Sequence, residues 1–167
     1  MFAVAHRLSY VGFAAALSCT FATPTSADLL NQKALSAAIA VEMAVQTIAT
    51  CKTNGYAVSV TVVGRNGEPL IQLRGDGTGP DTVENSFKKA FTSRTFRIPS
   101  GEMEERLKKN PQMGAQYLTG FTTGRGALPI KVGEETIGAI GASGAPGGEK
   151  DEACVKAGID KVAGQLK

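Results

Sequence analysis

A glycine-rich stretch between an apolar run and a helical pattern constrains this chain more than any other part of its sequence. The stretch reads GAIGASGAPGGEKDE over residues 138–152 and contains five glycines and Pro146. Glycine permits positive φ and close backbone approach, and acidic residues favour the positive end of a helix. The pattern therefore predicts a strand that turns tightly into the last helix.

This junction has two interpretations. The backbone N–H groups of the turn can face a ligand, in which case Gly144, Gly147 and Gly148 would belong to a binding site. Alternatively, the glycines serve only a tight turn and close helix packing. The spacing matches neither GxxxxGK[ST] nor GxGxxG, so it gives little support to nucleotide binding.

The first 27 residues have the layout of a secretory signal peptide. Arg7 precedes a mostly apolar run from Leu8 to Ala22, and small residues stand before Asp28. The run is too short and wrongly flanked for a transmembrane anchor. We therefore expect a single domain over residues 28–167 in a periplasmic or secreted protein, with lipidation at Cys19 as an alternative to simple cleavage.

Loss of that segment would remove the only histidine, His6. A mature chain without imidazole excludes Ser-His-Asp and Cys-His catalysis and most zinc sites. The net charge of +3 and the lack of a basic run argue against a nucleic-acid partner.

Two cysteines, Cys51 and Cys154, remain after the expected cleavage. In an oxidising compartment such a pair suggests a disulfide, and two buried thiols are the alternative. A bridge requires the end of the first helix and the start of the last to lie side by side, with Cα atoms within about 7 Å.

Hydrophobic periodicity predicts helices and hairpins along the chain. In the first half we expect the following elements: a helix from Leu29 to about Thr53 capped by Asp28, strands Tyr56–Val63 and Glu68–Arg74, and a helix capped by Asp81 or Thr82 that runs to about Phe96. In the second half we expect these: a short helix capped by Ser100, a strand near Tyr117–Thr122, a hairpin of Ala127–Val132 and Glu135–Ser143, and a last helix over Glu149–Gln165. Hairpins in place of strand–helix alternation predict an α+β domain with a mostly antiparallel five-stranded sheet and helices packed on it.

Three stretches together resemble the GlcG/HbpS-like family, also described as haem-binding or haem-degrading. They are GYAVSVTVVGRNGEPL (55–70), ENSFKKAFTSRTFR (84–97) and GALPIKVGEETIGAIGASGAPGGEKDEACVKAG (126–158). The resemblance implies a profilin- or PAS-like fold and homo-oligomers. Some members bind haem, some of these take part in its degradation or in sensing, and related domains accompany cobalamin-handling or glycolate-utilisation systems.

The resemblance also implies site residues. Lys89-Ala90-Phe91-Thr92 corresponds to the family's Lys-Ala-aromatic-Thr motif, so Lys89 and Arg94 would pair with haem propionates while Phe91 or Phe96 stacks on the ring. An exposed row of cations and ordinary core aromatics are the alternatives. Without histidine, the axial candidates are Met103, Met113, Tyr117 and, as a weak hydroxyl ligand, Thr92.

Three functions follow as hypotheses. The first is an exported protein that binds haem or a related tetrapyrrole, with weak haem-degrading activity. The second is a non-enzymatic oligomeric accessory or sensor domain. The third is an enzyme acting on a small carboxylate, which ranks last because no pair of carboxylates stands at a telling spacing.

Overall fold

The computed structural model describes residues 28–116 and 120–167. The expected signal peptide, with His6 and Cys19, and the axial candidate Tyr117 lie outside these residues. All the elements below belong to the unit Gln32–Lys167. None of the helices within the described ranges has the length and apolar character needed to cross a bilayer.

The sheet has four strands in the order β2-β1-β4-β3, and every neighbouring pair is antiparallel. The two hairpins are formed by β1 with β2 and by β3 with β4, as predicted. Their bounds are Ser59–Val63 (β1), Pro69–Leu73 (β2), Ala127–Val132 (β3) and Glu135–Ser143 (β4). The α+β class and the antiparallel sheet are therefore confirmed.

The prediction of a fifth strand near Tyr117–Thr122 is wrong for the part that the structure describes, because residues 120–122 are not in a strand. Gly120 has φ of 84°, which is left-handed rather than extended. The backbone N–H of Thr122 donates to Thr92 Oγ1 at 2.9 Å, so it pairs with a helix side chain and not with a neighbouring strand.

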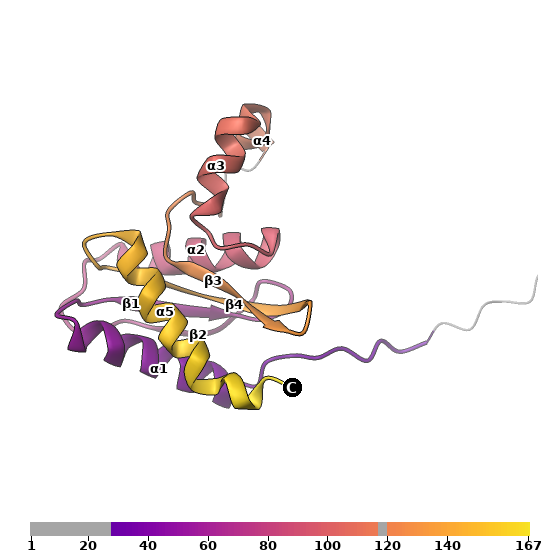
Figure 1. The fold of residues 1–167 in the computed structure, drawn as a ribbon, viewed down its shortest axis with the longest axis horizontal. Coiled ribbons are helices and arrows are strands. Elements are labelled where there is room, and N and C mark those ends of the chain that lie inside the picture. Colours follow the sequence, from indigo (N-terminus) through magenta and orange to yellow (C-terminus); the bar gives the residue numbers. More distant parts are fainter. Residues whose placement is uncertain (1–27, 117–119) are drawn as a thin grey trace, which may run out of the picture. The chain divides into compact units, whose positions relative to one another are not determined.

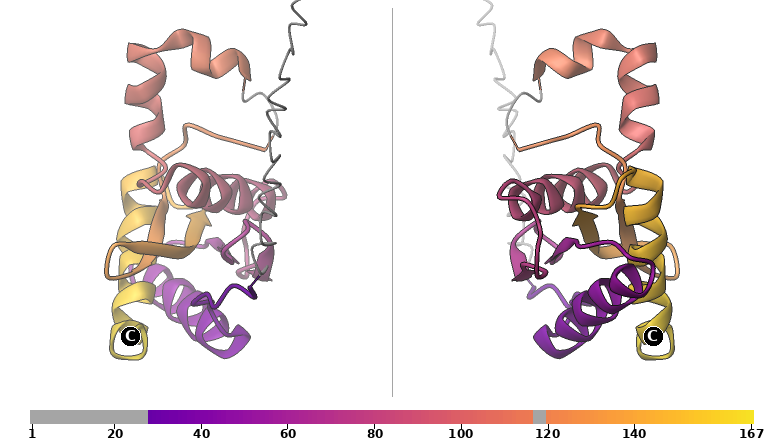
Figure 2. Two further views of the ribbon diagram at one scale, coloured as in Figure 1. Left: turned by 90° about the vertical axis from the view of Figure 1, so that its right-hand side faces the viewer. Right: turned by 90° about the vertical axis from the view of Figure 1, so that its left-hand side faces the viewer.

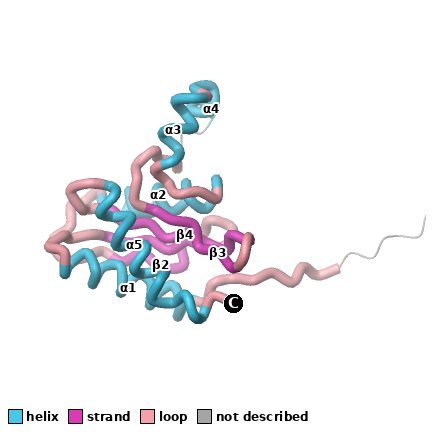
Figure 3. The backbone as a smooth tube through the Cα atoms, viewed as in Figure 1, coloured by secondary structure: helices cyan, strands magenta, loops and turns pink. Residues whose placement is uncertain are grey.

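Helices cover both faces of the sheet (Figures 1 and 3). The helices α1 (Ala37–Thr53) and α5 (Gly148–Val162, followed by a 3-10 turn over Ala163–Gln165) lie side by side against one face. The helix α2 (Thr82–Phe96) lies against the other face, as the two side views of Figure 2 show.

The alternation of side chains along β1 decides what each layer contacts. Val60 and Val62 belong to the apolar core that includes residues of α1 and α5. On the opposite face, Ser59 Oγ lies 2.8 Å from Thr82 Oγ1, and Thr61 Oγ1 lies 2.7 Å from the hydroxyl of Ser86. The α2 layer thus packs partly through paired buried hydroxyls, which satisfies groups that would be costly to bury alone.

Close packing of α2 on the sheet depends on Gly141 of β4. A Cβ atom at this position would lie 2.6 Å from the carbonyl oxygen of Ser86 and 2.8 Å from the backbone nitrogen of Ala90. Both atoms are helix backbone and cannot move aside easily. The glycine therefore sets the distance between the helix and the sheet.

The helix α1 begins at Ala37, so its predicted start after Asp28 is wrong. Ser36 is the N-cap, and its hydroxyl accepts the backbone N–H of Ile39 at 3.3 Å. The preceding residues are held by tertiary contacts: Gln32 accepts a hydrogen bond from Arg65, and Leu35 is buried in the core. These contacts favour a non-helical segment over an earlier helix start.

Two short helices, α3 (Glu102–Lys109) and α4 (Pro111–Gln116), lie on the far side of α2 from the sheet (Figure 1). Ser100 does not cap α3, contrary to prediction, because Gly101 occupies the N-cap. The buried hydroxyl of Ser100 instead donates to the carbonyl of Gly124 and accepts the N–H of Ala127, at 2.8 and 3.1 Å. It fastens the loop that leads into β3.

A disulfide joins Cys51 in the last turns of α1 to Cys154 in α5, with the Cα atoms 5.5 Å apart. Both cysteines are buried. The predicted pairing and the side-by-side arrangement of the two helices are confirmed.

Candidate functional site

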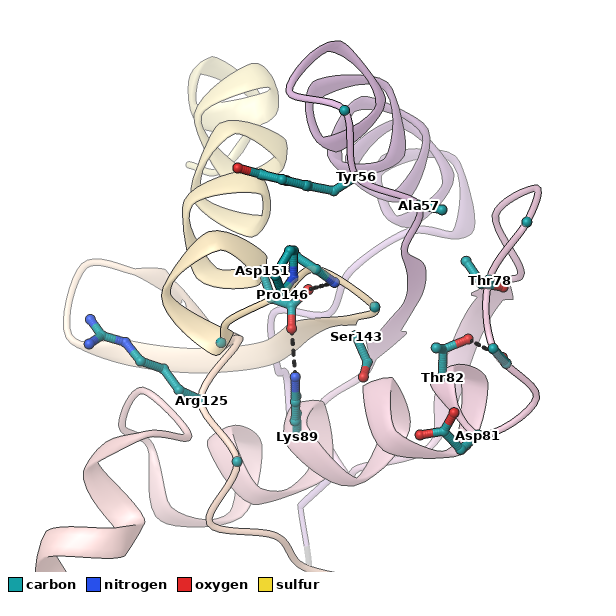
Figure 4. A pocket seen from close by; sticks show the side chains of 17 residues that line it. Tyr56, Ala57, Thr78, Asp81, Thr82, Lys89, Arg125, Ser143, Pro146 and Asp151 are labelled. Carbon is teal, nitrogen blue, oxygen red and sulfur yellow. Dashed lines mark hydrogen bonds and ion pairs between the residues drawn. The ribbon is translucent and has the colours of Figure 1, made fainter.

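A cleft of about 660 Å³ opens at the predicted glycine junction (Figure 4). Its walls come from four segments that are distant in sequence: the loop after α1 (55–57), the loop before α2 (77–82), residues 124–125, and the β4–α5 junction (143–148). Lys89 from α2 and Asp151 from α5 also line it. The junction therefore forms part of a cavity, with Gly144 and Gly148 in its lining, whereas Gly147 is the N-cap of α5 and is not a lining residue.

Gly144 makes this arrangement sterically possible. Its φ is 137°, and a Cβ atom would lie 2.3 Å from the carbonyl oxygen of Ala57. Only glycine combines that backbone angle with so close an approach. The β4–α5 junction can therefore pack directly against the backbone of the loop that follows α1.

A buried ion pair stands in the cleft. The ammonium group of Lys89 donates to Asp151 Oδ2 at 2.8 Å and to the carbonyl of Ala142 at 3.0 Å, and the side chains of Lys89 and Asp151 are 11% and 3% exposed. The second carboxylate oxygen of Asp151 accepts the N–H of Ala145 at 3.0 Å. An ammonium group has three donors, so these two described bonds leave one N–H of Lys89 for a ligand.

The protonation of Asp151 is set by opposing effects. Burial raises the pKa of the Asp151 carboxyl above its usual value, while the hydrogen bond and charge of Lys89 and the Ala145 N–H act against this rise. The cleft thus contains a carboxyl that takes up a proton more readily than an ordinary aspartate does.

Two further cations stand near the cleft. Arg125, another lining residue, donates from Nε and Nη2 to the two carboxylate oxygens of Glu152 at 3.0 and 2.9 Å, and these hydrogen bonds raise the pKa of Arg125. The ammonium group of Lys150 lies 5.3 Å from the centre of the Tyr56 ring. Arg125 has a side chain that is 57% exposed, so its ion pair can open at little cost.

The aromatic residues predicted for haem stacking lie elsewhere. The ring of Phe91 is 5.6 Å from that of Phe87 and 5.3 Å from that of Phe121, and Phe96 lies 5.4 Å from Phe121. None of these rings lines the cleft. Of the candidates predicted on α2, Lys89 alone is a lining residue.

Arg94 lines a different pocket, so the structure does not bring Lys89 and Arg94 together in one cavity. Three of the predicted axial candidates, Met103, Met113 and Thr92, lie outside the cleft lining. Met103 is buried in α3, Met113 is half-buried in α4, and the buried hydroxyl of Thr92 donates to the carbonyl of Lys88 while accepting the N–H of Thr122.

Sequence reasoning missed two prominent residues of the cleft. The local pattern predicts that Asp151 only complements the positive end of the helix dipole. An acid one turn into a helix with an apolar face can also point toward the protein interior. The alternation places Tyr56 in a strand, but its N–H bonds to the carbonyl of Cys51 at the end of α1, and β1 starts only at Ser59. Its position directly after Asn54-Gly55 was the available signal of a loop.

The residues of the cleft fit the haem that the family resemblance implies. Tyrosinate is an established ligand of haem iron, and Tyr56 supplies a phenol in the cleft lining. Arg125, whose exposed ion pair with Glu152 can open, supplies a cation for a carboxylate side chain, and Lys89 adds its remaining N–H. No group of three or more His, Cys, Asp or Glu side chains placed to hold a bare metal ion occurs in residues 28–116 and 120–167.

Comparison with known proteins places this chain in a family. Residues 35–160 match the family model described as haem-degrading protein HbpS-like. The crystal structure of HbpS is 33% identical with a TM-score of 0.75, and the match covers 80% of this chain and 93% of that one. A double mutant of Streptomyces reticuli HbpS is 32% identical with a TM-score of 0.75, over 84% of this chain and 97% of that one.

A more distant match shares the fold. The PduOC:heme complex is 18% identical with a TM-score of 0.69, over 76% of this chain and 94% of that one. The comparison with curated proteins gave no significant match. The extent of the family match and the identity to HbpS together show that the chain belongs to the HbpS-like family of haem-degrading proteins.

Proposed function

We propose that this protein binds haem or a related tetrapyrrole in the cleft at the glycine junction. The observation that carries the proposal is the cleft itself, whose volume of about 660 Å³ is within the usual range for small-molecule sites and whose lining offers a phenol and two cations. Membership of the HbpS-like family and the heme complex of a protein with the same fold support this ligand class.

Each lining residue has a distinct role in the proposal. Gly144 and Gly148 let the wall of the cleft pack closely, because a Cβ atom at either position would meet the carbonyl oxygen of Ala57 or of Arg125. Tyr56 offers a phenolate to a ferric centre, and Lys89 and Arg125 bind the acid side chains. When bound, haem would supply the redox chemistry of its iron, and the family description supports haem degradation as the activity.

Export and self-association are further parts of the proposal. The Cys51–Cys154 disulfide and the signal-like segment support a periplasmic or secreted location. An apolar strip on α1, where Val41 and Val45 are 42% and 54% exposed, supports a homo-oligomer. This strip also favours the second candidate function, an oligomeric accessory or sensor domain. The strand order, with helices on both faces, is compatible with a profilin- or PAS-like fold.

Hemin titration followed by Soret absorbance tests the binding proposal. We expect a saturable Soret shift at micromolar hemin, and an altered visible spectrum in Tyr56→Phe, which keeps the ring but removes the phenol. Ala57→Trp should weaken binding, because Ala57 is an exposed residue of the cleft lining and the indole would occupy its mouth.

Ala49→Trp is the matched control, since Ala49 is an exposed residue of α1 that does not line the cleft. Equal hemin affinity in both tryptophan variants would contradict binding at this site. Absence of any Soret shift in the unmodified protein would refute haem binding and leave the accessory domain as the better hypothesis. Formation of open-chain products from bound hemin under a reductant is the separate test of degradation.

A further inference from the structure

We propose a second binding site, separate from the cleft, that takes an oxyanion: the carboxylate or phosphate group of a small molecule. It is a pocket of about 430 Å³ that includes three arginines, Arg65 from the β1–β2 turn and Arg94 and Arg97 from the end of α2. Its lining shares no residue with the glycine-junction cleft. The site therefore goes beyond the proposed haem-binding function.

The strongest sign of a missing ligand is the guanidinium group of Arg94. Its Nε atom is buried and has no hydrogen-bond partner among the residues that the structure describes. Buried donors are nearly always paired in native proteins, and a charged donor is the costliest to leave without an acceptor. An anion in the pocket would offset the charge of this guanidinium group without having to reach the buried Nε itself.

The electrostatic environment of Arg94 also indicates an anion. Burial, followed by the positive charges of Arg97 and Arg65, lowers the pKa of Arg94, and Glu68 acts weakly in the opposite direction. Like charges held this close repel one another. A bound anion would remove that repulsion, and guanidinium groups match carboxylate and phosphate oxygens in a bidentate manner.

The acids near the pocket are mostly engaged already. Glu135 forms an ion pair with Arg65, and the carboxylate of Glu68 accepts the backbone N–H of Asn66 at 2.8 Å. Among the described residues neither Arg94 nor Arg97 forms an ion pair within 4.0 Å. Glu134, an exposed lining residue on the β3–β4 turn, is the acid left to compete with a ligand.

The backbone at Arg97 agrees with a functional role. Arg97 is the C-cap of α2 and the one described non-glycine residue with positive φ, at 60°. Glycine or asparagine is the usual residue in this conformation. A cation at a helix C-terminus complements the dipole, but this explains neither the strained backbone nor the unpaired Nε of Arg94.

Thermal unfolding and calorimetric titration at low ionic strength, with inorganic phosphate and malonate as separate probes, test the proposal. We expect saturable stabilisation by at least one probe, which also identifies the favoured oxyanion. Arg94→Met should weaken binding by about ten- to a hundredfold. The same variant should unfold at a higher temperature than the unmodified protein without ligand, because it removes an unpaired buried donor.

Arg106→Met is the control for net charge, because Arg106 is exposed on α3 and lies outside the pocket. Glu134→Gln should strengthen binding by removing the competing acid. If Arg94→Met does not fold, Arg97→Asn, which suits the left-handed backbone, replaces it and should also weaken binding. The proposal is overturned if neither probe gives a saturable effect, or if Arg94→Met and Arg106→Met change the affinity equally.

Discussion

Replacing Lys89 by methionine removes one partner of the buried ion pair in the cleft. Methionine keeps most of the side-chain volume, so the main change is a buried Asp151 carboxylate without its cation. Both side chains are nearly inaccessible, at 11% and 3% exposure. Breaking such a pair costs about 3–5 kcal/mol of unfolding free energy, because the remaining charge is left in a poorly hydrated place.

The penalty should depend on pH, and its sign follows from the pKa of Asp151. Burial already raises this pKa in the folded protein, so the folded state binds more protons than the unfolded state between the ordinary and the raised value. The stability contributed by Asp151 is therefore present at low pH and lost as pH rises through the raised pKa. In Lys89→Met the opposing effect of the ammonium group is gone, so the pKa rises further and the loss near pH 7 becomes larger.

Urea unfolding of the wild type and variants at about pH 7 and about pH 4, near the ordinary aspartate pKa of about 3.9, measures this effect. With a slope of about 2 kcal/mol per molar urea, a loss of about 4 kcal/mol lowers the midpoint by roughly 2 M at neutral pH. The double variant Lys89→Met/Asp151→Asn buries no charge, so its penalty should be well below the sum of the single penalties.

Lys88→Met is the matched control, because Lys88 is the adjacent residue and forms an exposed pair with Glu84. Its effect should stay within about 0.5 kcal/mol. A Lys89→Met penalty below about 1 kcal/mol at neutral pH, or one that is equal at the two pH values, would refute the reasoning.

Three further outcomes follow from the packing. Gly141→Ala should lower the unfolding free energy by about 1–3 kcal/mol in urea titration, because its Cβ would meet α2 backbone. Gly164→Ala, with no heavy atom within 4 Å of the added Cβ, should change this free energy little, and equal effects of the two variants would contradict the packing. Reduction of the disulfide, or Cys51→Ala/Cys154→Ala, should cost about 2–5 kcal/mol, and an unchanged urea midpoint with reductant would count against a structural role. Val45→Lys should lower the molar mass measured by light scattering if the α1 strip joins subunits, and an unchanged assembly would exclude that face.

Local patterns in the sequence were sufficient for the main elements of the fold. The period-two alternation at residues 56–63 predicted one strongly apolar face, and the structure places Val58, Val60 and Val62 in the core shared with α1 and α5. On the other face the hydroxyls of Ser59 and Thr61, together with Val63, meet α2. The hairpins and the Cys51–Cys154 bridge were also predicted. The errors at Ser100 and residues 120–122 occurred where a distant partner takes the hydrogen-bonding group that a local pattern would use. The predicted start of the first helix was wrong because Gln32 and Leu35 make tertiary contacts.

The site divides in the same way. The sequence identified the glycine junction and Lys89, but it grouped Lys89 with Arg94. Five residues along a helix correspond to about 500° of rotation, so these two side chains point in directions about 140° apart. The structure accordingly assigns them to different pockets.

The sequence by itself determined the hairpins, the cysteine pair, the glycine turn and the helices other than α4 and the start of α1. Each of these depends on residues close together in the chain or on two cysteines that have no other partner in the expected mature protein. Only the tertiary structure decided that Asp151 meets Lys89, that Tyr56 lines the same cleft, and that the Nε atom of Arg94 is buried with no acceptor among the described residues. These facts depend on how α2, α5 and three loops approach one another. Such approach distances are set by packing across the whole sheet, which no local pattern of residues records.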